Sequence, residues 1–280
     1  MTGAADWSGR VGDVWAAEYA RTERAFSATA AALDAAIATV APVSGHAVDL
    51  GCGVGGTTLA LAAARPMLQV TGIDLSSSLI EVARWRVGEA AAAPAFVVGD
   101  VLQVLPTLAP LDLLVSRHGL MFFADPVAGF SVLRAATALD APLVFSCFAA
   151  RSENEWVTVP ERTLGLSPRV EGAYAPGPFA LGDATFTRAL LHQSGWTDVQ
   201  LRLHRVDYVV GSGIDPVEDA LAFYRRIGPL ASLLSTASPA ERQSLETRLR
   251  DVLASRIRDG AVTFSAAIWI ITARAGKEVA

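Results

Sequence analysis

The sequence predicts an α/β fold in which a doubly wound, mostly parallel sheet has helices on both faces. Short, nearly continuous apolar runs alternate with helical segments through brief connections, as expected of strands that are buried on both faces. A glycine-rich stretch, VDLGCGVGGTT at 48–58, directly follows the first apolar run. Such folds bind ligands at the carboxyl ends of their strands, so this turn is the first candidate site.

The first half of the chain contains five candidate strands, at 46–50, 68–75, 95–100, 111–116 and 142–148. Before them, apolar residues recur at spacings of three and four, which predicts one long helix over about 13–40 that ends before Pro42. Ser76 is a candidate N-cap for the helix after the second strand.

The pattern is looser after residue 150. The segment 151–182 is rich in Pro and Gly, which predicts loop with a short helix. We then expect a helix capped by Asp183, a strand over 198–210, two helices that begin at Asp215-Pro216 and Ser238-Pro239, and a closing strand over 261–274. Three parts follow: a helical lid (1–40), a cofactor-binding core (41–150) and an acceptor-side part (151–280) with a helical cap at about 214–258.

Composition narrows the class of protein. Hydrophobic residues make up 52% and charged residues 18% of the 280 residues, which argues against disorder. The net charge of −5 and the lack of basic clusters argue against nucleic-acid binding. Two distant cysteines suggest no disulfide framework, and no apolar run is long enough for a membrane span. We expect a cytoplasmic enzyme with a small-molecule partner; the sequence leaves a homodimer open.

The glycine stretch fits two cofactor classes. Gly51, Gly53 and Gly56 match a dinucleotide fingerprint, and an acid such as Asp74 after the second strand can bind ribose hydroxyls in either class. However, Asp49 stands two residues before the first glycine, where it would repel a pyrophosphate. Asp100, after the third strand, could accept a hydrogen bond from an adenine amino group. Adenine, ribose and a cationic tail together describe S-adenosylmethionine.

The motifs VDLGCGVGG, GIDLS, VVGD and DLLVSRHGLMFFADP occur in this order at suitable spacing. In this respect residues 46–150 resemble class I S-adenosylmethionine-dependent methyltransferases, and more loosely a bacterial subgroup near the ubiquinone/menaquinone-biosynthesis-like methyltransferases. The resemblance implies a seven-stranded Rossmann-like sheet in which the last strand inserts antiparallel beside the fifth. It also implies these cofactor contacts: Gly51, Gly53 and Gly55 at the methionine part with Asp49 beneath it, Asp74 at the ribose, Asp100 and Val101 at the adenine, and Ser116 with Arg117 on the other side. Leu75, next to Asp74, and Trp15 complete the predicted cofactor-binding residues.

His118 departs from the resemblance, which implies an aromatic residue after the Ser-Arg pair. It is a candidate general base, because an unperturbed imidazole titrates near pH 6.5; the alternative is a packed histidine in the pocket wall. The candidate acceptor pocket is aromatic: Phe122, Phe123, Trp156, Tyr174 and Phe179.

The sequence therefore predicts metal-independent methyl transfer to a small, largely apolar molecule. Oxygen is the preferred acceptor atom because a base would help an alcohol or phenol to lose its proton. Carbon or nitrogen methylation remains an alternative. Two other classes also stay open: a nicotinamide-dependent oxidoreductase and a non-catalytic S-adenosylmethionine-binding regulator.

Overall fold

A computed structural model describes residues 4–88, 93–167 and 174–277 of the chain. Over these residues it contains one eight-stranded sheet with the order β3-β2-β1-β4-β5-β8-β6, and β7 pairs with β8 off this path. The strands are β1 (Gly45–Leu50), β2 (Leu68–Asp74), β3 (Ala95–Val98), β4 (Leu113–Arg117), β5 (Pro142–Phe148), β6 (Trp196–Gly211), β7 (Ile257–Arg258) and β8 (Ala261–Ala275).

The strand pairing confirms the doubly wound α/β fold. Strands β1 to β5 pair parallel, whereas β8 pairs antiparallel with both β5 and β6. The closing strand is therefore inserted beside the fifth, with Cys147 opposite Trp269. The eighth strand, which the sequence did not predict, is the two-residue β7 that forms a tight turn into β8.

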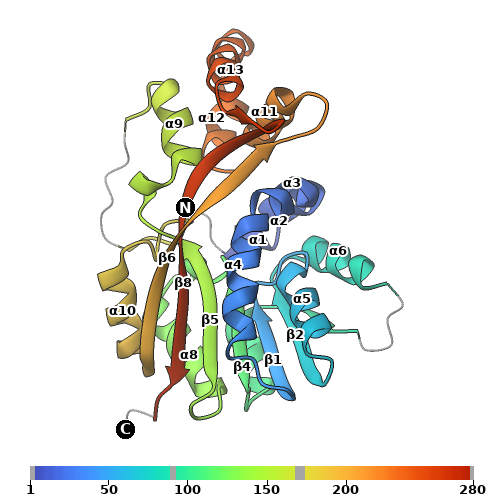
Figure 1. Cartoon of the computed structure of the whole chain (residues 1–280), viewed down its shortest axis with the longest axis vertical. Coiled ribbons are helices and arrows are strands. Elements are labelled where there is room, and N and C mark those ends of the chain that lie inside the picture. Colours follow the sequence, from blue (N-terminus) through green and yellow to red (C-terminus); the bar gives the residue numbers. More distant parts are fainter. Residues whose placement is uncertain (1–3, 89–92, 168–173, 278–280) are drawn as a thin grey trace.

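Helices cover both faces of the sheet (Figure 1). One face carries α4 (Ser27–Ala38), α5 (Gly56–Ala64) and α6 (Ser77–Val87), and the other carries α7 (Val101–Val104), α8 (Pro126–Ala136) and α10 (Ala184–Gln193). Fully buried aliphatic side chains fill both layers, for example Leu33 and Leu113 on the first face and Leu114 and Leu133 on the second. This burial is the main favourable term in the stability of the fold.

Side-chain caps set the starts of several helices, as the sequence predicted. Ser76 accepts a hydrogen bond from the Leu79 amide (3.2 Å), and Asp183 accepts one from Phe186 (2.7 Å). Asp215 caps α11 (Pro216–Arg226). Ser238 and Glu241 form a reciprocal capping box at the start of α13 (Pro239–Ala254).

The prediction of one continuous helix over 13–40 is wrong, because the helix is interrupted twice, at Glu18 and at Phe26. The chain forms α1 (Ala4–Trp7), α2 (Arg10–Ala17), α3 (Tyr19–Ala25) and α4, with Glu18 and Phe26 outside helical geometry at ψ values of 15° and 4°. At both breaks the residue contacts a part of the chain that is distant in the sequence. Glu18 is buried against Arg226 of α11 (2.6 Å), and Phe26 turns its ring toward His118 (5.0 Å between ring centroids).

Strands β6 and β8 extend past the other strands and carry a group of helices at their far end (Figure 1). These helices are α9 (Glu155–Thr163), α11, α12 (Leu230–Thr236) and α13. Helix α9 packs on β8, and α11 packs on β6. Side chains from this extension can therefore reach over the carboxyl ends of the parallel strands.

Candidate active site

The glycine loop needs glycine for two physical reasons. Gly51, Gly53 and Gly55 have φ values of 65°, 55° and 78°, a left-handed region that other residues rarely occupy. A Cβ on Gly51 would also lie 3.0 Å from the Cα of Gly119 in the loop after β4. The loop is thus a sharp turn held against a second turn, and it opens helix α5 directly behind it.

Asp74, the last residue of β2, holds this loop in place. Its Oδ2 accepts a hydrogen bond from the Gly53 amide (2.8 Å), and its Oδ1 accepts one from the Ser76 amide (2.9 Å). Burial raises the pKa of Asp74, although both amide bonds oppose that shift. Each carboxylate oxygen has a second lone pair that can accept a hydrogen bond from a ligand.

Asp100 has a similar position after β3. Its Oδ1 accepts from the Leu102 amide (2.9 Å), which caps the one-turn helix α7 and fixes the carboxylate at the strand end. Asp74 and Asp100 thus stand at the ends of neighbouring strands, since β2 pairs with β3 at Asp74 and Val98.

One cavity of about 380 Å³ lies above these strand ends. Its wall collects most of the residues that the sequence and the resemblance singled out: Trp15, Gly51, Gly53, Asp74, Leu75, Asp100, Val101, Arg117, His118, Phe122, Phe123 and Trp156. The motifs that lie far apart in the sequence therefore converge on a single site.

Five predicted site residues do not line this cavity. Asp49 lies beneath the loop, where its Oδ2 accepts from the Thr58 hydroxyl (2.6 Å). Gly55 faces the ring of Phe96, and a Cβ added to Gly55 would lie only 2.7 Å from the Cζ atom of that ring. Ser116 is fully buried, and its hydroxyl donates to the Leu50 carbonyl (2.6 Å). These three residues shape the floor of the site instead of contacting its contents.

The other two belong to the predicted acceptor pocket. The Tyr174 hydroxyl donates to the Phe123 carbonyl (2.7 Å), and its ring stacks on Phe186 at the surface. Phe179 packs behind Trp156 at a centroid distance of 6.1 Å. Both stabilise wall residues from outside the cavity.

Sequence reasoning missed several wall residues, among them Glu23, Phe26, Phe148 and Tyr208. Phe148 ends β5, so its place at a strand end was an available signal. Tyr208 and Phe26 gave no local signal, because their positions depend on how far β6 extends and on the bend between α3 and α4.

The environment of His118 is dry and aromatic. Its backbone has a φ of 61°, and its ring packs against Phe26 and against Phe148 (4.4 Å between centroids). Nδ1 lies 2.8 Å from the Ser146 hydroxyl, whereas Nε2 has no hydrogen-bond partner among the described residues. Burial, with a smaller contribution from the Arg117 charge, lowers the pKa of His118 to about 3. The imidazole is therefore neutral at physiological pH.

Trp156 is fixed in the cavity wall by a hydrogen bond to its backbone carbonyl from outside its own helix. Pro160 lies inside α9 and has no N–H to donate to the Trp156 carbonyl one turn earlier. The Tyr224 hydroxyl from α11 donates to that carbonyl instead (2.7 Å). The indole Nε1 of Trp156 donates to Asn154 Oδ1 (3.3 Å), which also accepts from the Ala267 amide of β8 (3.1 Å).

Glu23 of α3 bridges two arginines beside the glycine loop. It pairs with Arg117 and with Arg86 (3.0 Å), and Arg86 also donates to the Val54 carbonyl (2.7 Å). Among the described residues of the cavity wall, Arg117 is the one cation, because His118 is neutral. The charge of Arg117 is paired with that of Glu23.

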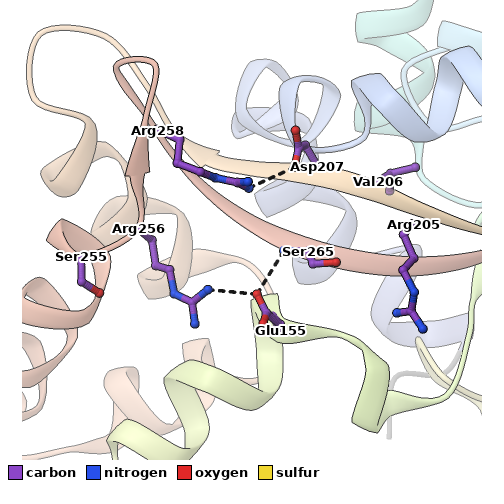
Figure 2. A pocket seen from close by; sticks show the side chains of 8 residues that line it. All are labelled: Glu155, Arg205, Val206, Asp207, Ser255, Arg256, Arg258 and Ser265. Atoms are coloured by element: carbon purple, nitrogen blue, oxygen red, sulfur yellow. Dashed lines mark hydrogen bonds and ion pairs between the residues drawn. The ribbon is translucent and has the colours of Figure 1, made fainter.

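A second, more open hollow of about 530 Å³ lies on the β6–β8 extension, lined by Glu155, Arg205, Val206, Asp207, Ser255, Arg256, Arg258 and Ser265. Figure 2 shows Arg256 paired with Glu155 and Arg258 paired with Asp207, each at 3.0 Å. Arg205 pairs with Glu153 (2.7 Å). These ion pairs are largely exposed and stabilise the surface only weakly. The chemically equipped site is the cavity at the strand ends.

Within the described ranges, no three or more His, Cys, Asp or Glu side chains are grouped as metal ligands. No helix in the same ranges is both long and apolar enough to cross a bilayer.

Comparison with known proteins identifies the family of this chain. Residues 47–139 match a family model described as a methyltransferase domain. The trans-aconitate 2-methyltransferase of Paracidovorax citrulli is 31% identical over 209 residues, which cover 67% of this chain and 75% of that protein. The chain therefore belongs to the class I S-adenosylmethionine-dependent methyltransferases, and S-adenosylmethionine is its cofactor.

Solved structures show the same fold at low sequence identity. The YcgJ protein from Bacillus subtilis superposes with a TM-score of 0.57 at 14% identity, over 88% of this chain and 98% of that one. The [4+2]-cyclase SpnF superposes with a TM-score of 0.54, also at 14% identity, over 89% and 81% of the two chains. These matches concern the fold alone.

Asp49 provides a test of the floor of the site. Burial raises its pKa to about 6. Between the ordinary value of 3.8 and about 6, the folded protein binds a proton that the unfolded chain has released, so this group destabilises the fold increasingly as pH rises. We expect Asp49→Asn to gain stability relative to wild type by about 1 kcal/mol more at pH 8 than at pH 5.

Urea denaturation of the cofactor-free proteins at both pH values would measure this difference. The control is Asp183→Asn, which makes the same substitution at an exposed helix cap outside the cavity. An Asp49→Asn difference that does not change with pH would mean that the buried carboxyl ionises like an exposed one.

Proposed function

We propose that this methyltransferase transfers the methyl group to an oxygen atom of a small, largely apolar molecule. The observation that carries the proposal is the single cavity: its lower wall holds the glycine loop, Asp74 and Asp100, and its upper wall is aromatic. A donor bound at the strand ends and an acceptor bound against the rings would meet within one space. Such placement provides most of the rate enhancement when the methyl donor is already activated.

At the cofactor end, we assign the contacts as follows. The methionine part would lie along Gly51 and Gly53, because neither has a side chain to obstruct it. The ribose hydroxyls would donate to Asp74, whose two oxygens are fixed by backbone amides. The adenine would lie between Leu75 and the α7 turn at Asp100 and Val101.

We further propose that the first three helices form the lid over this end. Trp7, Trp15, Glu23 and Phe26 all come from α1–α4 or their junctions and line the same cavity. Trp7 contacts both Trp15 (5.4 Å) and Phe122 (5.1 Å between centroids). The lid thus joins the wall through aromatic contacts that exclude water from the reacting atoms.

The charges of the wall support an oxygen acceptor over an amine. An ammonium group would need a free carboxylate or a base that takes its proton. Among the described wall residues, Glu23 is paired with two arginines, and Asp74 and Asp100 accept backbone hydrogen bonds at the cofactor end. The charges of the wall do not argue against a carbon acceptor. Carbon methylation is therefore the alternative.

The same charges argue for an acceptor unlike the one in the relative's name. Trans-aconitate is a tricarboxylate, and three carboxylates need several cations or many donors. Arg117 is the one charged base among the described wall residues, and Glu23 already occupies it.

The surroundings of His118 do not favour the base role that the sequence suggested. An imidazole whose pKa is about 3 attracts protons poorly at neutral pH. Moreover, the buried Ser146 hydroxyl has Nδ1 as its hydrogen-bond partner, and if it donates there, the ring proton must be on Nε2. We therefore assign His118 to the wall, and infer that the acceptor oxygen is acidic enough to ionise without a base.

A methyl-transfer screen with labelled S-adenosylmethionine tests this function directly. We expect label to enter phenols or apolar carboxylic acids, at rates that exceed those for aliphatic amines and tricarboxylates of similar size. Mass spectrometry of the product would identify the methylated atom. Exclusive transfer to trans-aconitate, or to an amine, would overturn the proposed acceptor class.

The ribose assignment predicts a loss of affinity. Hydrogen bonds to a charged group contribute roughly 1.5–3 kcal/mol each, so Asp74→Ala should weaken S-adenosylmethionine binding at least about tenfold. Calorimetry of the purified protein measures this change. Asp183→Ala is the matched control, because it removes a helix-capping carboxylate outside the cavity and should leave the affinity as in wild type.

The wall assignment of His118 predicts a particular pH profile. Wild type and a His118 variant should show the same pH profile of turnover between pH 5 and 8, because the imidazole is neutral throughout this range. A limb caused by Asp49, whose pKa is about 6, should persist in the variant. His118→Asn suits the left-handed backbone and should retain cofactor affinity, with turnover reduced by less than about tenfold. A wild-type limb near pH 6.5 that disappears in the variant, together with a loss of 10²–10⁴, would instead establish a general base.

A further inference from the structure

The Tyr208 hydroxyl is a polar group in the aromatic part of the cavity for which the fold provides no partner. Tyr208 lies on β6 and lines the cavity, and only 2% of its surface is exposed. No hydrogen bond joins its hydroxyl to another residue in the described part of the chain, yet its oxygen is not sealed off as His118 Nε2 is. The hydroxyl therefore has access to the cavity.

The other buried tyrosine of this region behaves differently. The Tyr224 hydroxyl donates to the Trp156 carbonyl at 2.7 Å, and Tyr174 near the surface donates to Phe123. A hydroxyl that no residue satisfies keeps its donor free for a molecule in the cavity. A fold that satisfies Tyr224 and leaves Tyr208 unsatisfied suggests that the partner of Tyr208 is a bound molecule.

Four aromatic rings fix the direction of this hydroxyl. Trp156 packs against the Tyr208 ring at 4.9 Å and 30°, Phe26 meets it edge-on at 5.5 Å and 89°, and Phe148 and Phe223 lie at 6.1 Å and 6.3 Å. Across the sheet its neighbour is Phe264 of β8. Such a frame places a polar atom in a set position, which is the arrangement that gives a binding site its specificity.

The hydroxyl can act as a donor at any working pH. Burial raises the pKa of Tyr208 well above that of a free phenol, so the proton stays on the oxygen. A fixed donor on the nucleophilic oxygen would make that atom less reactive. A second oxygen of the acceptor, such as a carbonyl, is the atom that gains from this hydrogen bond.

We propose that Tyr208 is the specificity-determining residue of the acceptor site and donates a hydrogen bond to an oxygen of the acceptor that is not methylated. The ligand class is an apolar molecule with a carbonyl or ether oxygen apart from its nucleophile. This inference rests on the proposed function for the location of the acceptor. It adds the feature by which that site would distinguish oxygenated acceptors from hydrocarbons of the same shape.

The test compares two probes that differ in one oxygen. 4-Hydroxyacetophenone and 4-isopropylphenol have nearly the same shape, but only the ketone can accept a hydrogen bond from Tyr208. Binding of each is measured by calorimetry to wild type and to Tyr208→Phe, with S-adenosylhomocysteine bound. We expect wild type to prefer the ketone by about three- to tenfold, and Tyr208→Phe to bind both probes equally.

Tyr224→Phe is the matched control. It also removes a tyrosine hydroxyl, but Tyr224 lies behind Trp156 and does not line the cavity. It should lower the melting temperature, because the Trp156 carbonyl loses its donor, and it should keep the preference for the ketone. Tyr208→Phe should melt at or above the wild-type temperature, because no bond within the chain is lost.

Three outcomes would overturn the proposal: no preference or no binding in wild type, an unchanged preference in Tyr208→Phe, or a loss of stability in Tyr208→Phe as large as that in Tyr224→Phe. Failure of the proposed function gives a separate result. If wild type selects the ketone but labelled methyl never reaches an oxygen in the screen, the role of Tyr208 stands and the assigned reaction is wrong.

Discussion

The site depends on the close contact between the turn after β1 and the turn after β4. Ser116 holds them together: its hydroxyl donates to the Leu50 carbonyl at 2.6 Å and accepts from the Gly119 amide at 3.2 Å. Gly51 and Gly119 then approach so closely that a Cβ on Gly119 would lie 2.5 Å from the Leu50 oxygen. The cofactor loop and the segment that carries His118 are therefore parts of one rigid floor, and donor and acceptor are positioned relative to each other by backbone contacts.

Local signals identified the residues of these two turns in the sequence, but not the contact that Ser116 makes between them. Glycines at positive φ, acids after buried strands and capping residues each act within a few residues, so their spacing along the chain identifies them. Asp74 and Asp100 illustrate this, because a strand end determines where each carboxylate lies. The bend at Phe26 was not predictable in this way. The apolar spacing continues through it, and the ring turns inward only because His118 and Tyr208 offer it a place to pack.

The aromatic wall illustrates the same limit more strongly. Tyr208 and Trp156 are 52 positions apart in the sequence, yet their rings pack at 4.9 Å. Their contact requires that β6 extend beyond the parallel strands and that α9 return over β8. Helix α9 is in turn held by Tyr224 through a carbonyl that Pro160 leaves without a donor. Each of these contacts has an ordinary physical cause, but none can be predicted from the sequence before the arrangement of the helices and strands is known.

Among the described residues, the buried polar atoms without a hydrogen-bond partner are Thr29 Oγ1, Asp49 Oδ1, Thr57 Oγ1, His118 Nε2 and Arg134 Nε, and two of them border the site. Asp49 Oδ1 lies below the loop without a partner among the described residues, His118 Nε2 is enclosed by phenyl rings, and the Tyr208 hydroxyl faces the cavity. Each of these groups makes the cofactor-free fold less stable than an apolar side chain of the same shape would. Elsewhere the buried polar groups mostly have partners; Asn154, for example, has hydrogen bonds on both sides of its amide. Asp49 Oδ1 and His118 Nε2 stay enclosed by the protein, whereas the Tyr208 hydroxyl opens to the cavity, so it is the one of the three that a bound molecule can reach.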